Sequence, residues 1–272
     1  MAQDRHGIAV HAMSLVHRRG PVFYASMPQQ SRTPGGHATR GGEARRHLVF
    51  ILWEYLVAAD LPRGRRALSS SRAAVPIQVV RDPLGKPFLL LGEHRGPSIS
   101  FSEGGGAVWA ALCGDESDIG IDVAEADEFQ GDYPVQRVFN AEELQHIAES
   151  VEGDMGKASA LLWSIKEAVV KALGCGFHLV GPRDIGVHPF VERDGEYTSR
   201  VCLSRKALER LPMGAGRSIW VHSVPRARMW LSIAFVNWER RDGEEPKAHG
   251  GLSLYPCCGA QSDSVPKAYW PV

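Results

Sequence analysis

The chain has 272 residues, and its 31 basic and 31 acidic residues leave no formal net charge. That balance removes any global electrostatic argument for binding nucleic acid. The length is sufficient for one large domain or two modest ones, and the composition is that of an ordinary globular protein.

The cysteines and the apolar runs indicate the cellular compartment in which we expect the protein. The five cysteines are odd in number and contain no CxxC pair, which argues against a zinc site and against a disulfide framework. The N-terminus has no apolar stretch followed by a small-residue cleavage site. The longest apolar run, residues 48–61, is interrupted by Glu54 and is too short to span a bilayer. We therefore expect a cytoplasmic protein that does not associate with membranes.

The first part of the chain predicts one helix and several strands. Residues 1–42 are rich in Gly, Pro, Ser and Arg, and we expect one edge strand near residues 22–24 plus loop. Apolar residues at helical spacing predict a helix over residues 43–59, which Pro62 ends. Strands are expected at residues 77–80, 88–91, 97–102, 107–112 and 118–123.

The second part repeats this order of helix and strands. Asn140 begins a helix, and Glu143 three residues later completes the pattern of a capping box. A stronger helix is predicted over residues 157–173, with Gly174 at its end. Strands are expected at residues 185–191, 199–203, 218–223 and 229–236, followed by a polar tail. Two similar α+β halves joined near residues 115–118 would explain the repeat.

The helix over residues 157–173 carries a candidate site. Trp163, Glu167 and Lys171 are four residues apart and therefore share one face. The same residues also fit an amphipathic helix with an exposed Glu–Lys pair, worth about 0.2–0.5 kcal/mol.

Asp122 lies in the middle of a short apolar strand, two residues after Gly120. Aspartate is depleted in strands, and burying its carboxylate without a partner is costly. A bound cation would remove that cost. The alternative is an Asp at a strand end that caps a nearby loop.

Three serines alternate along the strand near residue 100. Ser98, Ser100 and Ser102 are expected to lie on one side of that strand. Their hydroxyl groups would suit a phosphate, but they would equally suit a solvated sheet face.

Together and in this order, these segments resemble the surfactin-type 4′-phosphopantetheinyl transferases over residues 43–235. The segments that carry the resemblance are Gly85-Lys86-Pro87, Ser100-Phe101-Ser102, Gly120-Ile121-Asp122-Val123-Ala124, Phe139-Asn140-Ala141-Glu142-Glu143, and Trp163 through Gly176. The resemblance implies an α+β fold of two pseudo-symmetric αβ halves, each a small antiparallel sheet with a packed helix. These halves would span residues 1–117 and 118–238, with coenzyme A between them and a polar tail at residues 239–272.

The resemblance also implies an activity. The protein would transfer the 4′-phosphopantetheine group from coenzyme A to a serine of an apo acyl or peptidyl carrier protein, as a holo-carrier-protein synthase does, and release 3′,5′-ADP. The reaction would depend on Mg²⁺, which usually takes one or two carboxylates plus phosphate oxygens and waters. Two halves in one chain should complete the cleft, so we expect a monomer.

Site residues follow by position from the same resemblance. Asp122 and Glu167 would bind the magnesium ion, and Lys171 would contact the phosphates. Either Glu167 or a metal-bound water would then take the proton of the carrier serine. Arg46, Lys86 and Ser100 would help to hold coenzyme A.

Two departures from the family pattern leave an alternative open. Phe101 stands where the family usually has histidine, and Ala124 stands where many members have a third carboxylate. The alternative is a catalytically degenerate relative that binds coenzyme A or a carrier protein without transfer. Glu143 also matches the family, but we expect a structural role in the capping box.

Overall fold

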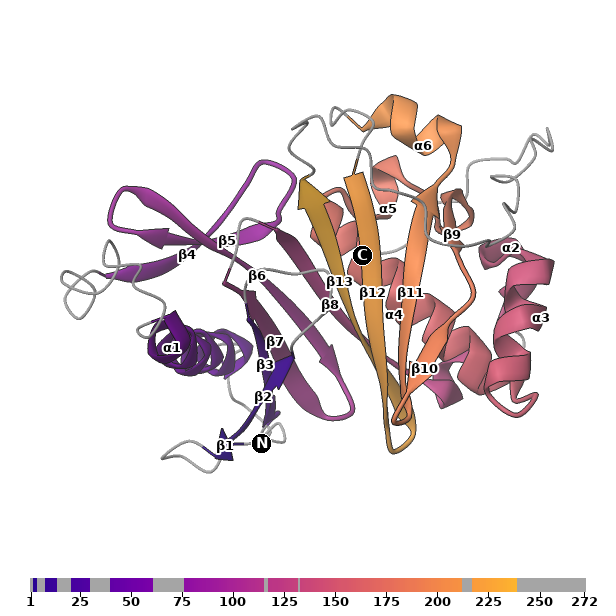
Figure 1. The fold of residues 1–272 in the computed structure, drawn as a ribbon, viewed down its shortest axis with the longest axis horizontal. Coiled ribbons are helices and arrows are strands. Elements are labelled where there is room, and N and C mark those ends of the chain that lie inside the picture. Colours follow the sequence, from indigo (N-terminus) through magenta and orange to yellow (C-terminus); the bar gives the residue numbers. More distant parts are fainter. Residues whose placement is uncertain are drawn as a thin grey trace. The chain divides into compact units, whose positions relative to one another are not determined.

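The computed structural model in Figure 1 describes residues 2–3, 8–13, 21–29, 40–60, 76–114, 117–131, 133–211 and 217–238. The polar tail expected at residues 239–272 lies outside these residues. Among the described helices, none combines the length and the apolar character that a membrane crossing requires.

The first half is an antiparallel sheet with one long helix against it (Figure 1). The strand order is β1-β2-β3-β7-β6-β5-β4. The bounds are β1 Ala2–Gln3, β2 Ala9–Met13, β3 Val22–Pro28, β4 Ile77–Arg81, β5 Pro87–Leu91, β6 His94–Gly104 and β7 Ala107–Cys113. Helix α1 (Arg40–Asp60) packs against β3 and β7. This half therefore has the sheet and helix that the sequence predicted.

The second half also has an antiparallel sheet with a long helix against it. Its strand order is β10-β11-β12-β13-β8, and β9 pairs with β11. The bounds are β8 Asp118–Glu125, β9 Ile185–Val187, β10 Val191–Arg193, β11 Glu196–Leu203, β12 Arg217–Arg226 and β13 Met229–Trp238. The helices are η2 Ala126–Phe129, α2 Val135–Val138, α3 Ala141–Ser150, α4 Met155–Leu173, α5 Gly176–Leu179, η3 Pro182–Asp184 and α6 Arg205–Arg210. Helix α4 packs against β8 and β13, which completes the predicted α+β fold of two halves.

The expectation of an edge strand near residue 22 is wrong. Strand β3 pairs with β2 on one side and with β7 on the other. Its residues Phe23 and Ala25 belong to the core beneath α1, whereas Val22 and Tyr24 belong to a different core. A strand that pairs with a neighbour on each side is an interior strand of its sheet.

A third core joins the two sheets. Its side chains come from β2, β3 and β7 of the first sheet and from β8 and β13 of the second, and they include Trp109, Ile121 and Phe235. Side chains alternate along a strand, so the opposite face of β8 is left for α4. Strand β8 is therefore held between α4 and the first half.

Candidate functional site

Strand β8 is at the edge of the second sheet, and the serines of β6 cover that edge. The backbone N–H of Ile119 donates to Ser98 Oγ at 3.2 Å, and that of Ile121 donates to Ser100 Oγ at 3.1 Å. Ser102 Oγ donates to Asp122 Oδ1 at 2.9 Å. The three serines thus lie on one side of β6 as predicted. Ser100 and Ser102 are buried, so this is not a solvated sheet face.

Helix α4 crosses β8 at very short range. A Cβ atom on Gly120 would lie 1.9 Å from the Ala168 carbonyl oxygen and 2.5 Å from the Ala172 nitrogen. Only glycine permits this approach, because no larger residue fits between the strand and the helix backbone. The glycine of the Gly120-Ile121-Asp122 segment thereby brings the Asp122 carboxylate close to α4.

The exposure pattern of α4 isolates one narrow stripe. Between residues 158 and 173 every side chain is buried except Trp163, Glu167 and Lys171, which are partly exposed. These three side chains share a face, as the sequence predicted, and Glu167 and Lys171 also form the partly exposed pair that the alternative of an amphipathic helix would show. Trp163 packs against Phe129 and Phe177, which leaves the two charged groups at the accessible end of the stripe.

Lys171 joins the two predicted carboxylates. Its Nζ donates to Asp122 Oδ1 at 2.6 Å and lies 3.5 Å from Glu167 Oε2. Burial raises the pKa of Asp122 to about 6; Lys171 opposes this rise in pKa, and Glu167 adds to it. The structure therefore brings together the three residues that the sequence assigned to metal and phosphate.

A hollow of about 450 Å³ lies beside this cluster, between the first half and the end of α4. Its cationic lining residues are Arg45, Arg81, Lys86 and Lys171, and Glu103 is its acidic lining residue. Ser100, Phe101 and Ser102 form part of its wall. The excess of cationic groups suits a ligand that carries several phosphates.

Lys86 is among the residues that line this hollow, but its ammonium group is already paired. Lys86 Nζ donates to the Ala172 carbonyl oxygen at 2.5 Å and forms an ion pair with Asp118 Oδ1 at 2.5 Å. Burial lowers the pKa of Lys86, although Asp118 counteracts this. Lys86 therefore connects the first half to the C-terminal end of α4, where an ammonium group interacts favourably with the helix dipole.

The two adjacent arginines of α1 occupy different places. Arg46 is exposed and is not among the residues that line the hollow, whereas Arg45 lines it. Arg45 Nη2 donates to Glu103 Oε1 at 2.9 Å, and its guanidinium lies 5.8 Å from the centre of the Phe101 ring.

Sequence reasoning missed two arginines that line the hollow, Arg45 and Arg81. A usable signal existed for Arg45, which precedes the buried Leu48 and Leu52 by three and seven residues and so lies on the inner stripe of α1. Arg81 donates to the Gly85 carbonyl oxygen at 2.7 Å, a contact that no sequence pattern indicated.

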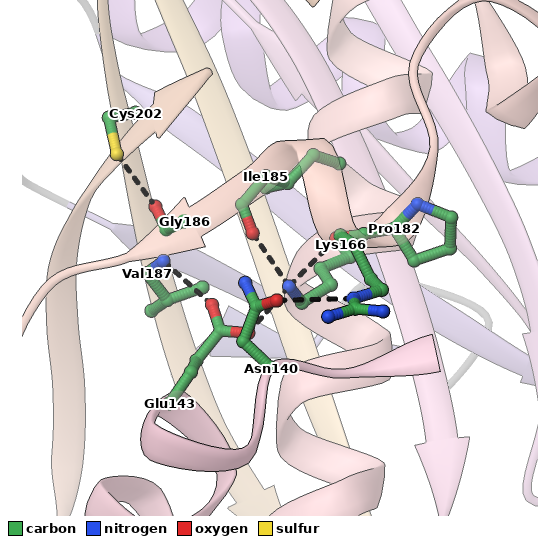
Figure 2. A network of polar contacts seen from close by, with 9 residues as sticks. Asn140, Glu143, Lys166, Pro182, Ile185, Gly186, Val187 and Cys202 are labelled. Atoms are coloured by element: carbon green, nitrogen blue, oxygen red, sulfur yellow. Dashed lines mark hydrogen bonds and ion pairs between the residues drawn. The ribbon is translucent and has the colours of Figure 1, made fainter. Parts of the chain in front are cut away.

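The capping box expected at the start of α3 is wrong. Asn140 is the N-cap residue, but its side chain makes no capping hydrogen bond. Glu143 points instead toward α4, where its Oε2 accepts from Lys166 Nζ at 2.7 Å and its Oε1 accepts from the Val187 N–H at 2.9 Å (Figure 2). Glu143 is therefore paired with a buried lysine in place of the expected cap, and its structural role stays a prediction.

The donor set fits a divalent cation. The Lys171 ammonium group already lies between Asp122 and Glu167, which shows that both carboxylates face one position for positive charge. Ala124 is buried in the core and supplies no third carboxylate. The neighbouring Glu125 accepts a hydrogen bond from the Gly105 N–H through its Oε1. Within the described ranges, no cluster of three or more His, Cys, Asp or Glu side chains is placed to hold a metal. Two carboxylates suffice for Mg²⁺ when phosphate oxygens and waters complete its shell.

Comparison with known families bears directly on this cluster. Residues 118–210 match the model of the 4′-phosphopantetheinyl transferase superfamily. This match covers less than half of the chain. The superfamily segment contains Asp122, Glu167, Lys171 and the Glu143–Lys166 pair, but the hollow is completed by residues that precede the match.

Similarity to individual proteins is weaker. The chain is similar to a solved structure of the Chronobacterium ammoniagenes ACPS–CoA complex, at 20% identity and a TM-score of 0.35, covering 46% of this chain and 100% of that chain. A TM-score this low does not establish a shared arrangement of elements. No curated protein matches the sequence significantly.

Proposed function

We propose that this protein transfers the 4′-phosphopantetheine group of coenzyme A to a serine of an apo carrier protein. The observation that carries the proposal is the meeting of Asp122, Glu167 and Lys171 beside a basic hollow. The position of all three residues within the superfamily segment supports it.

Coenzyme A is the substrate that the hollow would receive. Arg45 and Arg81 would bind its phosphates, and we assign to Arg45 the role first expected of Arg46, because Arg45 lines the hollow. Ser100 accepts from a backbone N–H, and its own hydroxyl hydrogen would donate to a phosphate oxygen. Lys86 would form part of the wall, since its charge is already paired with Asp118.

The reaction itself requires positioning and charge neutralisation more than covalent help. The carrier serine oxygen would attack the phosphorus next to the pantetheine arm, the bond to the bridging oxygen would break, and 3′,5′-ADP would leave. Lys171 would neutralise charge on the pyrophosphate, and Glu167, which is partly exposed, would take the serine proton. Magnesium held by Asp122 and Glu167 would supply further neutralisation of the phosphate charge.

The proposal extends to partners and location. An apo acyl or peptidyl carrier protein would be the acceptor, as for a holo-carrier-protein synthase. Both halves contribute to the hollow, which supports a protein that works as a monomer. The odd cysteine count without CxxC pairs supports a reducing compartment, and we propose the cytoplasm.

A labelling experiment tests this function. The purified chain is incubated with Mg²⁺, a fluorescent coenzyme A conjugate and a panel of apo carrier proteins, and the label on each carrier serine is located by mass spectrometry. We expect labelling that a chelator abolishes. Binding of coenzyme A by calorimetry without labelling of any carrier would instead indicate the degenerate relative.

A further inference from the structure

Ser102 occupies an unusual position between the two halves. It belongs to β6 of the first sheet, yet its hydroxyl donates to Asp122 of the second sheet at 2.9 Å. Lys171 Nζ lies 3.4 Å from the same hydroxyl oxygen. Ser102 is 6% exposed and lines the hollow. A buried hydroxyl group therefore contacts two of the three charged members of the site, Asp122 and Lys171.

The contacts of Asp122 are unevenly distributed over its two oxygens. Within the described part of the chain, the hydrogen bonds from Ser102 and Lys171 both reach Oδ1. Oδ2 is thereby left for another ligand. Two donors on one oxygen also fix the rotation of the carboxylate, because rotating it would break both hydrogen bonds.

Ser102 differs in this respect from the other serines of β6. Ser98 and Ser100 accept from backbone N–H groups of β8, a contact that closes the edge of a strand. Only the third serine in the row donates to a side chain, and that side chain is the carboxylate expected to bind metal.

We propose that Ser102 is a positioning residue for the cation site: its hydroxyl fixes Asp122 through Oδ1 and leaves Oδ2 to the cation. This inference rests on the proposed function. The first half of the chain would thus complete a site whose carboxylates both belong to the second half.

The chain has a physical need for such a contact. Because Ala124 stands where many family members have a third carboxylate, the cation would be held by Asp122 and Glu167. Each of these two carboxylates must therefore be well oriented for the cation to bind. Hydrogen bonds to metal-ligating side chains hold them in the productive orientation, and losing one typically costs about 10- to 100-fold in metal affinity. Replacing Ser102 by alanine would remove one of these two hydrogen bonds to Asp122 Oδ1 and leave the one from Lys171.

Binding of Mn²⁺ to the full-length chain, followed by electron paramagnetic resonance, tests the proposal without an activity measurement. We expect Ser102→Ala to weaken Mn²⁺ binding about tenfold or more. Ser98→Ala removes a hydroxyl from the same face of the same strand and should bind Mn²⁺ as the wild type does. Ser102→Thr keeps a hydroxyl and should bind more tightly than Ser102→Ala.

A fourth variant separates this proposal from the proposed function. If Asp122→Ala loses Mn²⁺ binding while Ser102→Ala binds as the wild type does, the role of Ser102 is wrong and the metal site stands. If Asp122→Ala binds Mn²⁺ normally, both fail. Equal weakening by Ser98→Ala and Ser102→Ala, or by Ser102→Thr and Ser102→Ala, would also overturn the role of the Ser102 hydroxyl.

Discussion

Adjacent arginines on α1 differ in environment, and that difference can be measured. Arg45 lines the hollow and contacts Glu103 and the Phe101 ring, whereas Arg46 is exposed. Arg45→Ala should weaken coenzyme A binding by about 1.5–3 kcal/mol, the contribution of a charged hydrogen bond. Arg46→Ala, a matched loss of charge, should change it by less than about 0.5 kcal/mol. Calorimetry on both variants compares them, and equal losses would contradict the placement of the ligand.

His222 predicts a pH dependence of stability. It is buried, with Nδ1 3.2 Å from Thr198 Oγ1 and Nε2 3.1 Å from Glu196 Oε2. Burial lowers the pKa of His222 below its usual 6.5, although Glu196 opposes the shift. Near that pH the unfolded chain therefore binds more protons than the folded chain, and the free energy of unfolding falls as the pH is lowered.

The measurement is the melting temperature between about pH 7.5 and about pH 5.5. The wild type should lose stability on acidification through this range. The melting temperature of His222→Gln, whose glutamine side chain does not titrate, should fall less over the same range. An equal decrease in the melting temperature of His222→Gln would show that other titrating groups dominate the pH dependence of stability.

Single residues were predictable where the sequence itself was unusual. Asp122 was identified because a carboxylate inside an apolar strand requires a partner, and its partners are Lys171 and Ser102. The sequence did not indicate which atoms those partners would reach. The direction of the Lys86 ammonium group toward Asp118 was equally invisible, since the two residues meet only through the packing of the halves.

A buried lysine on helix α4 holds the helix to its neighbours. The Lys166 side chain is 0% exposed, and its Nζ donates to Glu143 and to the carbonyl oxygens of Pro182 and Ile185. This network connects α4 with α3 and with the start of β9 (Figure 2). It fixes the helix one residue before Glu167, and so supports the position of the site.

Breaking the network should cost more than losing a helix cap. Glu143→Ala should lower the free energy of unfolding by about 3–5 kcal/mol, because a buried ammonium group loses its counter-charge. The double variant Glu143→Leu/Lys166→Met should lose much less than the sum of its single variants. Urea unfolding of the wild type, Glu143→Leu, Lys166→Met and the double variant measures this coupling, and Glu143→Ala is measured beside them. Additive losses, or a Glu143→Ala loss of only about 1 kcal/mol as for a cap, would contradict the ion pair.

Elements were predictable wherever hydrophobic periodicity was strong. The expected helix over residues 157–173 corresponds to α4, and Gly174 ends it in a left-handed conformation with φ of 73°. The prediction of a capping box was wrong because Lys166, which is distant in sequence, binds the Glu143 carboxylate instead. The expected strand over residues 185–191 is divided between β9 and β10, which both pair with β11.

At the scale of the whole molecule, the two halves depend on each other. The third core, the serines of β6 and the Lys86–Asp118 pair all connect the first sheet with β8 or α4. Met1–Arg240 accordingly form one compact unit. The boundary expected between residues 117 and 118 stays a prediction.

The most direct test is the transfer rate as a function of Mg²⁺ concentration for the wild type, Asp122→Asn and Glu167→Gln. Both substitutions keep the shape of the side chain and remove its charge. The account predicts transfer that requires Mg²⁺ in the wild type and falls about 10²-fold or more in each variant, at little cost in melting temperature. Transfer that persists under chelation, or variants that retain the wild-type rate, would contradict it.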